Sequence, residues 1–321
     1  MTRQVGSTLS VDDNRFTLDG NHVDLWGIRT ASGTATDAQT DHLIDQLDTY
    51  QEYGINAITV FFSGCSGAYY DPFSPDGAHI DSDHLGRMER IIRACASQDI
   101  IVFVGIFYQR VAYELVDRQA VHQAVQTVAE SLGSYDNIVI NIANEHTSHH
   151  WAAFADRFDM RDPDRILELC AIVHDIDPDR IVGGGGYHPE TCVVIGRGQS
   201  ADVVLFDTGN EGTTRFDTGS MHDRLGQAGV PKKPLVNVET FGGWTDSFPR
   251  GIFPAELRTA YEREVMRAAA RPGASLFFHN NPWCQSPHLP MRYDVGGAGT
   301  PEDPGIRWYF ELIEEVSKRS E

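Results

Sequence analysis

Hydrophobic positions along the chain alternate between two spacings. Continuous apolar runs, which predict buried strands, lie at residues 57–62, 100–107, 138–143, 180–184, 203–206, 235–239 and 274–279. Positions repeating every three or four residues, which predict helices, lie at 41–53, 85–97, 116–132, 165–176, 223–228, 254–270 and 306–317. Before them, Asp19-Gly20 separates apolar segments at 16–18 and 23–28. An Asp-Gly pair in that setting predicts a hairpin, and 23–28 is the first of eight strands.

Strict alternation of strands and helices predicts a parallel sheet. Eight such units in 321 residues predict an α/β fold of one domain, a (β/α)8 TIM barrel over residues 1–321, with the hairpin and first strand at 15–28. A doubly wound open sheet is the alternative. No Gly-x-Gly-x-x-Gly follows the first strand, which excludes dinucleotide binding of that type. The run Gly183 to Gly186 lacks the lysine of a phosphate loop, so we expect it to form a tight strand exit.

Two of the apolar strands end on a glutamate, Glu145 and Glu239. Side chains alternate along a strand, so Asn141 should share a face with Glu145, and Asn237 with Glu239. In a barrel these are strands four and seven, whose C-terminal ends lie across the mouth where such enzymes place their sites. Two carboxyl groups there can approach to about 5 Å, the separation of a retaining glycosidase. The alternative is that each glutamate is half of a structural ion pair.

Composition narrows the possible partners. The net charge is −20 with only three lysines, which argues against nucleic acid and anionic membranes as partners. Such acidity is typical of proteins from saline habitats, but also of ordinary acidic proteins. No apolar run is long enough to cross a bilayer and the N-terminus lacks signal-peptide features, so we expect a soluble protein, either cytoplasmic or secreted with its signal removed. Five scattered cysteines argue against a disulfide framework or a cysteine zinc site. The oligomeric state stays open.

The two glutamate segments resemble signatures of glycoside hydrolase clan A, most closely the cellulase-type family 5. The segment Tyr135 to Glu145 is similar to the fourth-strand signature, in which Asn-Glu supplies the acid/base. The segment Val236-Asn-Val-Glu239 is similar to the seventh-strand signature that supplies the nucleophile. Trp283 in His279-Asn-Asn-Pro-Trp283 matches the tryptophan that follows strand eight in the clan.

The resemblance implies a retaining glycoside hydrolase that acts on a β-linked oligo- or polysaccharide, with no cofactor and no metal. Glu145 would protonate the glycosidic oxygen and later activate water, and Glu239 would attack the anomeric carbon. Asn144 would bind the sugar 2-hydroxyl, and Trp283 would floor the subsite of the reacting sugar, unless it is a buried structural plug.

Further substrate-binding candidates follow other strands. Arg29 after strand one would orient the nucleophile, or else form a surface ion pair. Tyr108 after strand three, Tyr187 after strand five and Trp244 after strand seven stand where barrel loops build subsites.

Three family features are missing from the sequence. There is no arginine at the end of strand two, no histidine pair after strand three, and no tyrosine or histidine near strand six. Neighbouring loops would then have to supply these roles, or the specificity is unusual.

Two other functions remain open. His146, His149 and His150 could hold a metal for a sugar isomerase or hydrolase, with His146 and His150 on one helix face and Asp207 or Glu239 completing the site. The barrel could also bind carbohydrate without turnover.

Overall fold

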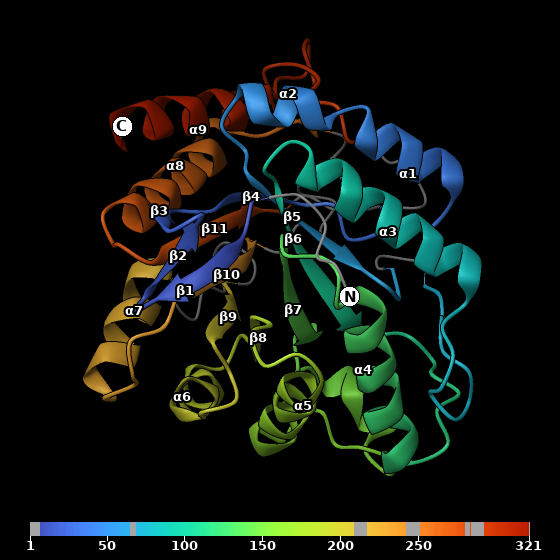
Figure 1. Cartoon of the computed structure of the whole chain (residues 1–321). Coiled ribbons are helices and arrows are strands. Elements are labelled where there is room, and N and C mark those ends of the chain that lie inside the picture. Colours follow the sequence, from blue (N-terminus) through green and yellow to red (C-terminus); the bar gives the residue numbers. More distant parts are fainter. Residues whose placement is uncertain are drawn as a thin grey trace.

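Eight parallel strands close into a barrel in the computed structural model, which describes residues 7–64, 69–208, 217–241, 251–279, 283 and 292–320. The strands follow one another in chain order around the barrel, and β10 and β11 complete the circle back to β4 (Figure 1). They are β4 (Trp26–Arg29), β5 (Ala57–Phe61), β6 (Ile101–Phe107), β7 (Ile138–Ala143), β8 (Val182–Gly186), β9 (Val203–Asp207), β10 (Leu235–Thr240) and β11 (Ala274–Phe278). The predicted (β/α)8 barrel is therefore confirmed.

A small antiparallel sheet closes the N-terminal end of the barrel. It consists of β1 (Leu9–Asp12), β2 (Arg15–Leu18) and β3 (Asn21–Val23), and it lies in front of the barrel strands in Figure 1. The Phe16 ring packs edge-on against Phe103 inside the barrel, with 6.3 Å between ring centroids. The hairpin prediction is correct, but residues 23–28 are divided between β3 and β4 because the chain leaves one sheet and enters the other. The pattern also did not predict β1.

Helices surround the barrel as an outer layer (Figure 1). They are α1 (Asp37–Ile44), α2 (Leu47–Glu52), α3 (Ser82–Ala96), α4 (Arg118–Leu132), the 3-10 helix η1 (His149–Phe154), α5 (Pro163–Ile176), α6 (Pro189–Arg197), α7 (Thr218–Gln227), α8 (Ala255–Ala269) and α9 (Arg307–Ser320). Aspartates cap several of them: Asp81 and Asp117 each accept a hydrogen bond from a backbone N–H in the first turn.

Some helices differ from the sequence prediction. The predicted helix at 41–53 is two helices, because the backbone N–H of Gln46 bonds to the Leu43 carbonyl three residues back and tightens the turn. Helix α6 was not predicted, since its Pro189 start and Gly196 near its end favour a loop.

The apolar core has two main parts. One fills the barrel interior and includes Phe103, Val139 and Phe277, and the other lies between the barrel and the helices. The strands β5 to β11 separate these two parts of the core, and every position along them is buried. The barrel wall is therefore rigid enough to hold side chains at its ends in fixed positions.

The glycine run is the strand β8 itself, so the predicted tight strand exit is wrong. A Cβ on Gly183 would lie 2.2 Å from the Val203 carbonyl oxygen, and one on Gly185 only 1.4 Å from that of Leu205. The glycines thus allow β8 to approach β9 closely, and the run has no left-handed φ angles.

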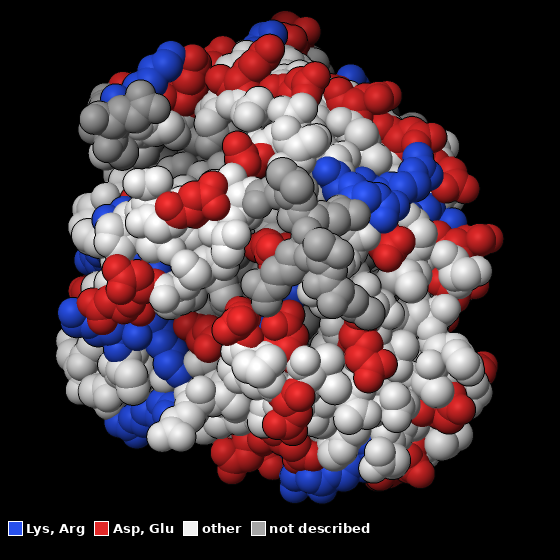
Figure 2. Space-filling model, viewed as in Figure 1, with Lys and Arg blue, Asp and Glu red and all other residues white. Residues whose placement is uncertain are grey.

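The surface agrees with the acidic composition. Carboxylates are spread over the face seen in Figure 2, whereas lysine and arginine gather in a few patches. Among the residues that the structure describes, none of the helices has both the length and the apolar character needed to cross a bilayer.

Candidate active site

Glu145 stands in a strained turn directly after β7. Its φ angle is +40°, in the left-handed region that side chains other than glycine rarely adopt. The buried indole of Trp151 secures the turn by donating from Nε1 to the backbone carbonyls of Asn144 and Glu145, each at 3.2 Å. The half-buried Glu145 side chain is therefore held at the C-terminal end of the barrel.

Gln109 joins Asn144 to Glu145. Its side-chain oxygen accepts a hydrogen bond from Asn144 Nδ2 at 2.9 Å, and its Nε2 donates to Glu145 Oε2. Gln109 is buried two residues beyond the end of β6, at the place where the family's histidine pair was missing. The sequence did not lead us to predict Gln109 as a site residue. The only feature that pointed to it is its position directly after Tyr108, behind the third strand.

Glu239 lies near the end of β10 and is 4% exposed. Arg29 Nη2 lies 3.3 Å from Glu239 Oε2, and His279 Nδ1 lies 3.4 Å from Oε1. The guanidinium is itself 1% exposed, so this ion pair is buried and not on the surface. A buried carboxylate is costly unless a cation and hydrogen bonds accompany it, and here Arg29 offsets that cost.

Arg29 connects the ends of the two glutamate strands. The Nη2 that contacts Glu239 also donates to Asn144 Oδ1 at 2.8 Å, and Nη1 donates to the Val238 carbonyl at 3.4 Å. The guanidinium also lies over the Phe61 ring, 5.2 Å from its centroid. Arg29, Asn144 and Glu239 are thus in one contact network, as expected if the ends of strands four and seven meet.

A change of register in β10 orients Glu239. The pairing with β9 and β11 shifts just after Asn237. Asn237 Nδ2 donates to Thr218 Oγ1 at the start of α7, 3.1 Å away, and its Oδ1 accepts from the Glu239 N–H at 3.3 Å. The prediction that Asn237 and Glu239 share a face is therefore wrong, because the irregularity breaks the two-residue alternation.

A third acid, Asp207, ends β9 and pairs in register with Glu239. It is 5% exposed. Burial, followed by the charges of Glu239 and Glu145, raises the pKa of Asp207 well above its usual range, and Arg29 opposes that shift. This position is the end of strand six, where the family's tyrosine or histidine was missing.

Trp283 is buried, with 2% of its surface exposed. Its Nε1 donates to the Asp294 carbonyl at 2.7 Å, and the Arg292 guanidinium lies 4.5 Å from the ring centroid. Gly251 and Gly296 lie so close that a Cβ on either would be 2.4 Å from the indole. A sugar floor needs an exposed ring face. The geometry therefore favours the alternative in which Trp283 is a structural plug.

The other three candidates differ in their surroundings. Tyr108 is buried with its ring edge-on to Phe61, 5.5 Å between centroids, and its N–H bonds to the Tyr113 hydroxyl. Tyr187 is half-buried and donates weakly to the Thr147 carbonyl at 3.5 Å. Trp244 lies outside the described residues.

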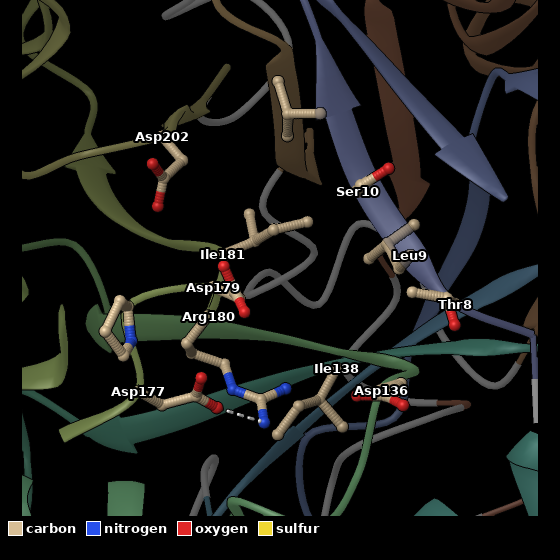
Figure 3. A pocket seen from close by; sticks show the side chains of 12 residues that line it. Thr8, Leu9, Ser10, Asp136, Ile138, Asp177, Asp179, Arg180, Ile181 and Asp202 are labelled. Atoms are coloured by element: carbon tan, nitrogen blue, oxygen red, sulfur yellow. Dashed lines mark hydrogen bonds and ion pairs between the residues drawn. The ribbon is translucent and has the colours of Figure 1, made fainter. Parts of the chain in front are cut away.

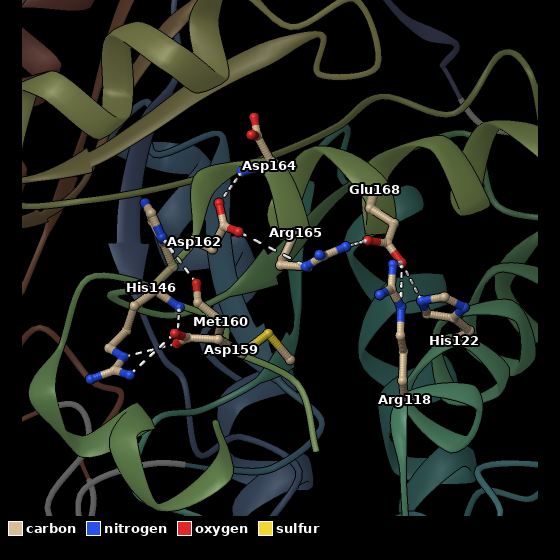
Figure 4. A network of polar contacts seen from close by, with 10 residues as sticks. Arg118, His122, His146, Asp159, Met160, Asp162, Asp164, Arg165 and Glu168 are labelled. Atoms are coloured by element: carbon tan, nitrogen blue, oxygen red, sulfur yellow. Dashed lines mark hydrogen bonds and ion pairs between the residues drawn. The ribbon is translucent and has the colours of Figure 1, made fainter. Parts of the chain in front are cut away.

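The histidines after Glu145 do not form the predicted metal site. His146 precedes η1 and is fully buried, so it shares no helix face with His150. Figure 4 shows its ring turned toward the Met160 carbonyl, which Nδ1 meets at 3.2 Å. Burial lowers the pKa of His146 to about 4, so it is neutral near pH 7. Within the described ranges, no group of three or more His, Cys, Asp or Glu side chains could hold a metal ion.

A pocket of about 430 Å³ lies at the other end of the barrel (Figure 3). It is lined by β1 and by residues at or just before the starts of β7, β8 and β9. Its arginine, Arg180, is engaged by Asp177 at 2.9 Å and by the Tyr135 carbonyl at 2.6 Å. It is remote from the C-terminal strand ends, so the glutamates and not this pocket define the candidate site.

The sequence also matches a known protein family. The sequence pattern of the family described as Cellulase (glycosyl hydrolase family 5) matches residues 16–182, more than half of the chain. None of the curated proteins matches the sequence.

Solved structures share the fold at low identity. A family 5 glycoside hydrolase from Bacteroides vulgatus is 15% identical with a TM-score of 0.64, over 98% of this chain and 70% of that one. The β-mannanase of the blue mussel Mytilus edulis is 15% identical with a TM-score of 0.60, over 99% and 97%. A β-glucanase from Saccharophagus degradans, in complex with cellotetraose, is 13% identical with a TM-score of 0.61, over 99% and 95%. The family match over more than half of the chain shows that this chain, a closed barrel with glutamates at the ends of strands four and seven, belongs to glycoside hydrolase family 5 and is a glycosidase.

Proposed function

We propose that the enzyme cleaves a β-glycosidic bond in an oligo- or polysaccharide with retention of configuration, and that residues 1–321 form one catalytic domain. Glu239 is the nucleophile and Glu145 the acid/base. In such a double displacement, one carboxylate forms a covalent glycosyl-enzyme while the other carboxyl group protonates the leaving oxygen and then activates water.

The observation that carries the proposal is the different surroundings of the two glutamates. Glu239 is buried with its Oε2 3.3 Å from Arg29 Nη2, a charge-assisted contact that holds the carboxyl group in one position, as a nucleophile requires. Glu145 is half-buried and accepts a hydrogen bond from the neutral amide of Gln109. A half-buried carboxyl group can exchange protons with water, as an acid/base must.

The network around Arg29 also assigns a role to Asn144. Its Oδ1 is held by Arg29 and its Nδ2 by Gln109, so the amide is fixed beside both glutamates. We propose that it contacts the 2-hydroxyl of the reacting sugar, because hydrogen bonds to that hydroxyl strengthen in the transition state.

The substrate is proposed to be a β-linked glycan of neutral hexoses. β-Mannanases and a β-glucanase bound to cellotetraose are among the proteins of similar fold. The test is a panel of soluble β-mannans and β-glucans together with aryl β-glycosides, scored for release of reducing ends or of the aryl group. We expect hydrolysis of at least one member without added metal. Binding of a glycan with no product would instead identify a non-catalytic carbohydrate-binding barrel.

A further inference from the structure

The backbone holds Asp207 beside the proposed nucleophile. Asp207 and Glu239 are register partners on β9 and β10. The next residue, Thr208, donates to the Glu239 carbonyl from its N–H at 3.3 Å and from its hydroxyl at 3.2 Å. The Thr208 hydroxyl also accepts from the Phe241 N–H at 3.0 Å. These bonds join the ends of the two strands, so Asp207 cannot move away from Glu239 without breaking them.

Asp207 is a buried acid whose hydrogen-bonding capacity is unused by the described part of the chain. Neither Oδ1 nor Oδ2 has a hydrogen-bond partner there. Buried polar side chains in native proteins are nearly always satisfied, and exceptions need an explanation. In a glycosidase mouth, the partner that satisfies such a group can be a hydroxyl of the substrate.

The charged surroundings favour the protonated form of this carboxyl group. Burial is the largest influence that raises the pKa of Asp207, followed by the charges of Glu239 on β10 and Glu145 after β7. Arg29 on β4 lowers it, but that guanidinium already contacts Glu239 and Asn144. Among the described charges that act on Asp207, two carboxyl groups thus oppose one arginine. A proton on Asp207 relieves the repulsion, because neighbouring carboxyl groups cannot all ionise easily.

Two further titratable groups face this region from the neighbouring elements. His279 follows β11 and contacts Glu239 at 3.4 Å. Cys192 on α6 bonds through Sγ to the Gly186 and Leu205 carbonyls, and burial raises the pKa of its thiol to about 12, so it stays neutral. The neutral thiol therefore adds no charge beside Asp207.

We propose that Asp207 binds the sugar next to Glu239 as a protonated carboxylic acid, donating a hydrogen bond to a sugar hydroxyl. This inference rests on the proposed function. A protonated carboxyl group offers one donor and one acceptor, whereas a carboxylate only accepts. Ionisation of Asp207 would remove the donor and add a negative charge beside Glu239. Sugar binding and turnover should therefore weaken as the pH rises.

Asp207→Asn and Asp207→Ala separate this role from its alternatives. Asparagine keeps a donor and an acceptor in nearly the same shape and cannot ionise. We expect Asp207→Asn to keep kcat/KM within a few-fold at the pH optimum of the wild type and to move the alkaline limb of the pH profile upward. Asp207→Ala should lose about tenfold in kcat/KM, the loss of one good hydrogen bond. Equal losses in both variants would overturn the proposal, because the ionised carboxylate of Asp207 would then be the form that binds the sugar. Unchanged kinetics in both would overturn it as well.

Thermal unfolding tests the protonation of Asp207 without any substrate. A carboxyl group whose pKa is raised by folding leaves the folded protein with more bound protons than the unfolded chain above about pH 4, so the stability falls as pH rises through that window. We therefore expect Asp207→Asn to melt above the wild type near neutral pH, by a difference that grows from pH 4 upward. A difference independent of pH would contradict the protonated state. If the wild type melts as expected but cleaves no glycoside, the proposed function fails and the sugar-binding role fails with it.

Discussion

Replacing Glu239 by alanine is expected to abolish hydrolysis of every substrate, with a loss of about 10⁴-fold or more in kcat. A nucleophile is needed whatever the leaving group, and removing one of a group of residues that act together removes nearly all of the chemical acceleration. The measurement is kcat on an activated aryl β-glycoside and on a natural glycan. Both should fall to the background rate.

The controls must separate chemistry from folding, because Glu239 neutralises a buried arginine. Breaking a buried ion pair by removing one partner costs about 3–5 kcal/mol. Glu239→Gln keeps the shape and an oxygen acceptor, and circular dichroism should show it folded. Asp177→Asn is the matched control: the Asp177 carboxylate also pairs with a buried arginine, Arg180, at 2.9 Å, but it lies at the opposite end of the barrel. It should lower the melting temperature and leave kcat close to that of the wild type. A Glu239→Gln enzyme with kcat near that of the wild type would refute the nucleophile assignment.

Replacing Glu145 by alanine is expected to affect substrates unequally. Acid assistance contributes about 10²–10⁴-fold when the leaving group is poor, and little when it is a dinitrophenolate. The variant should therefore lose hydrolysis of natural glycans, yet still form the glycosyl-enzyme rapidly from a dinitrophenyl β-glycoside. Release of the sugar should then be slow, because the general base that activates water is gone.

Azide distinguishes this role from simple damage to the site. A small anion can attack the glycosyl-enzyme without a general base, so azide should accelerate turnover of Glu145→Ala and give a β-glycosyl azide. It should not rescue Glu239→Ala in this way. An equal loss for good and poor leaving groups, with no effect of azide, would show that Glu145 is not the acid/base.

The periodic parts of the fold could be predicted from sequence because burial dictates them. All eight barrel strands were predicted, and β7 has the bounds that its apolar run indicated, residues 138–143. Buried parallel strands are continuous apolar runs, which makes them easy to recognise. Elements that depend on tertiary contacts were missed or misjudged. The glycine run of β8 reflects the closeness of β9, and β1 is stabilised by contacts with the end of the barrel.

The site residues divide in the same way, into those that an apolar run reveals and those that depend on tertiary contacts. Glu145 and Glu239 could be found because each ends an apolar run. The face of the strand on which Asn237 lies could not be predicted, since a local register shift leaves no pattern in the sequence. Gln109 and Asp207 stand where the family signatures are absent, and only the fold places them beside the glutamates. The burial of Trp283 depends on Gly251 and Gly296, which are distant in sequence from each other.

The central claim is a double displacement at Glu239, and the anomeric configuration of the first product tests it most directly. Wild-type enzyme should be mixed with an aryl β-glycoside or a susceptible glycan and followed by proton NMR before the product mutarotates. Two successive inversions at the anomeric carbon predict that the β-anomer appears first and the α-anomer only later. Initial formation of the α-anomer would show a single displacement by water and contradict the account.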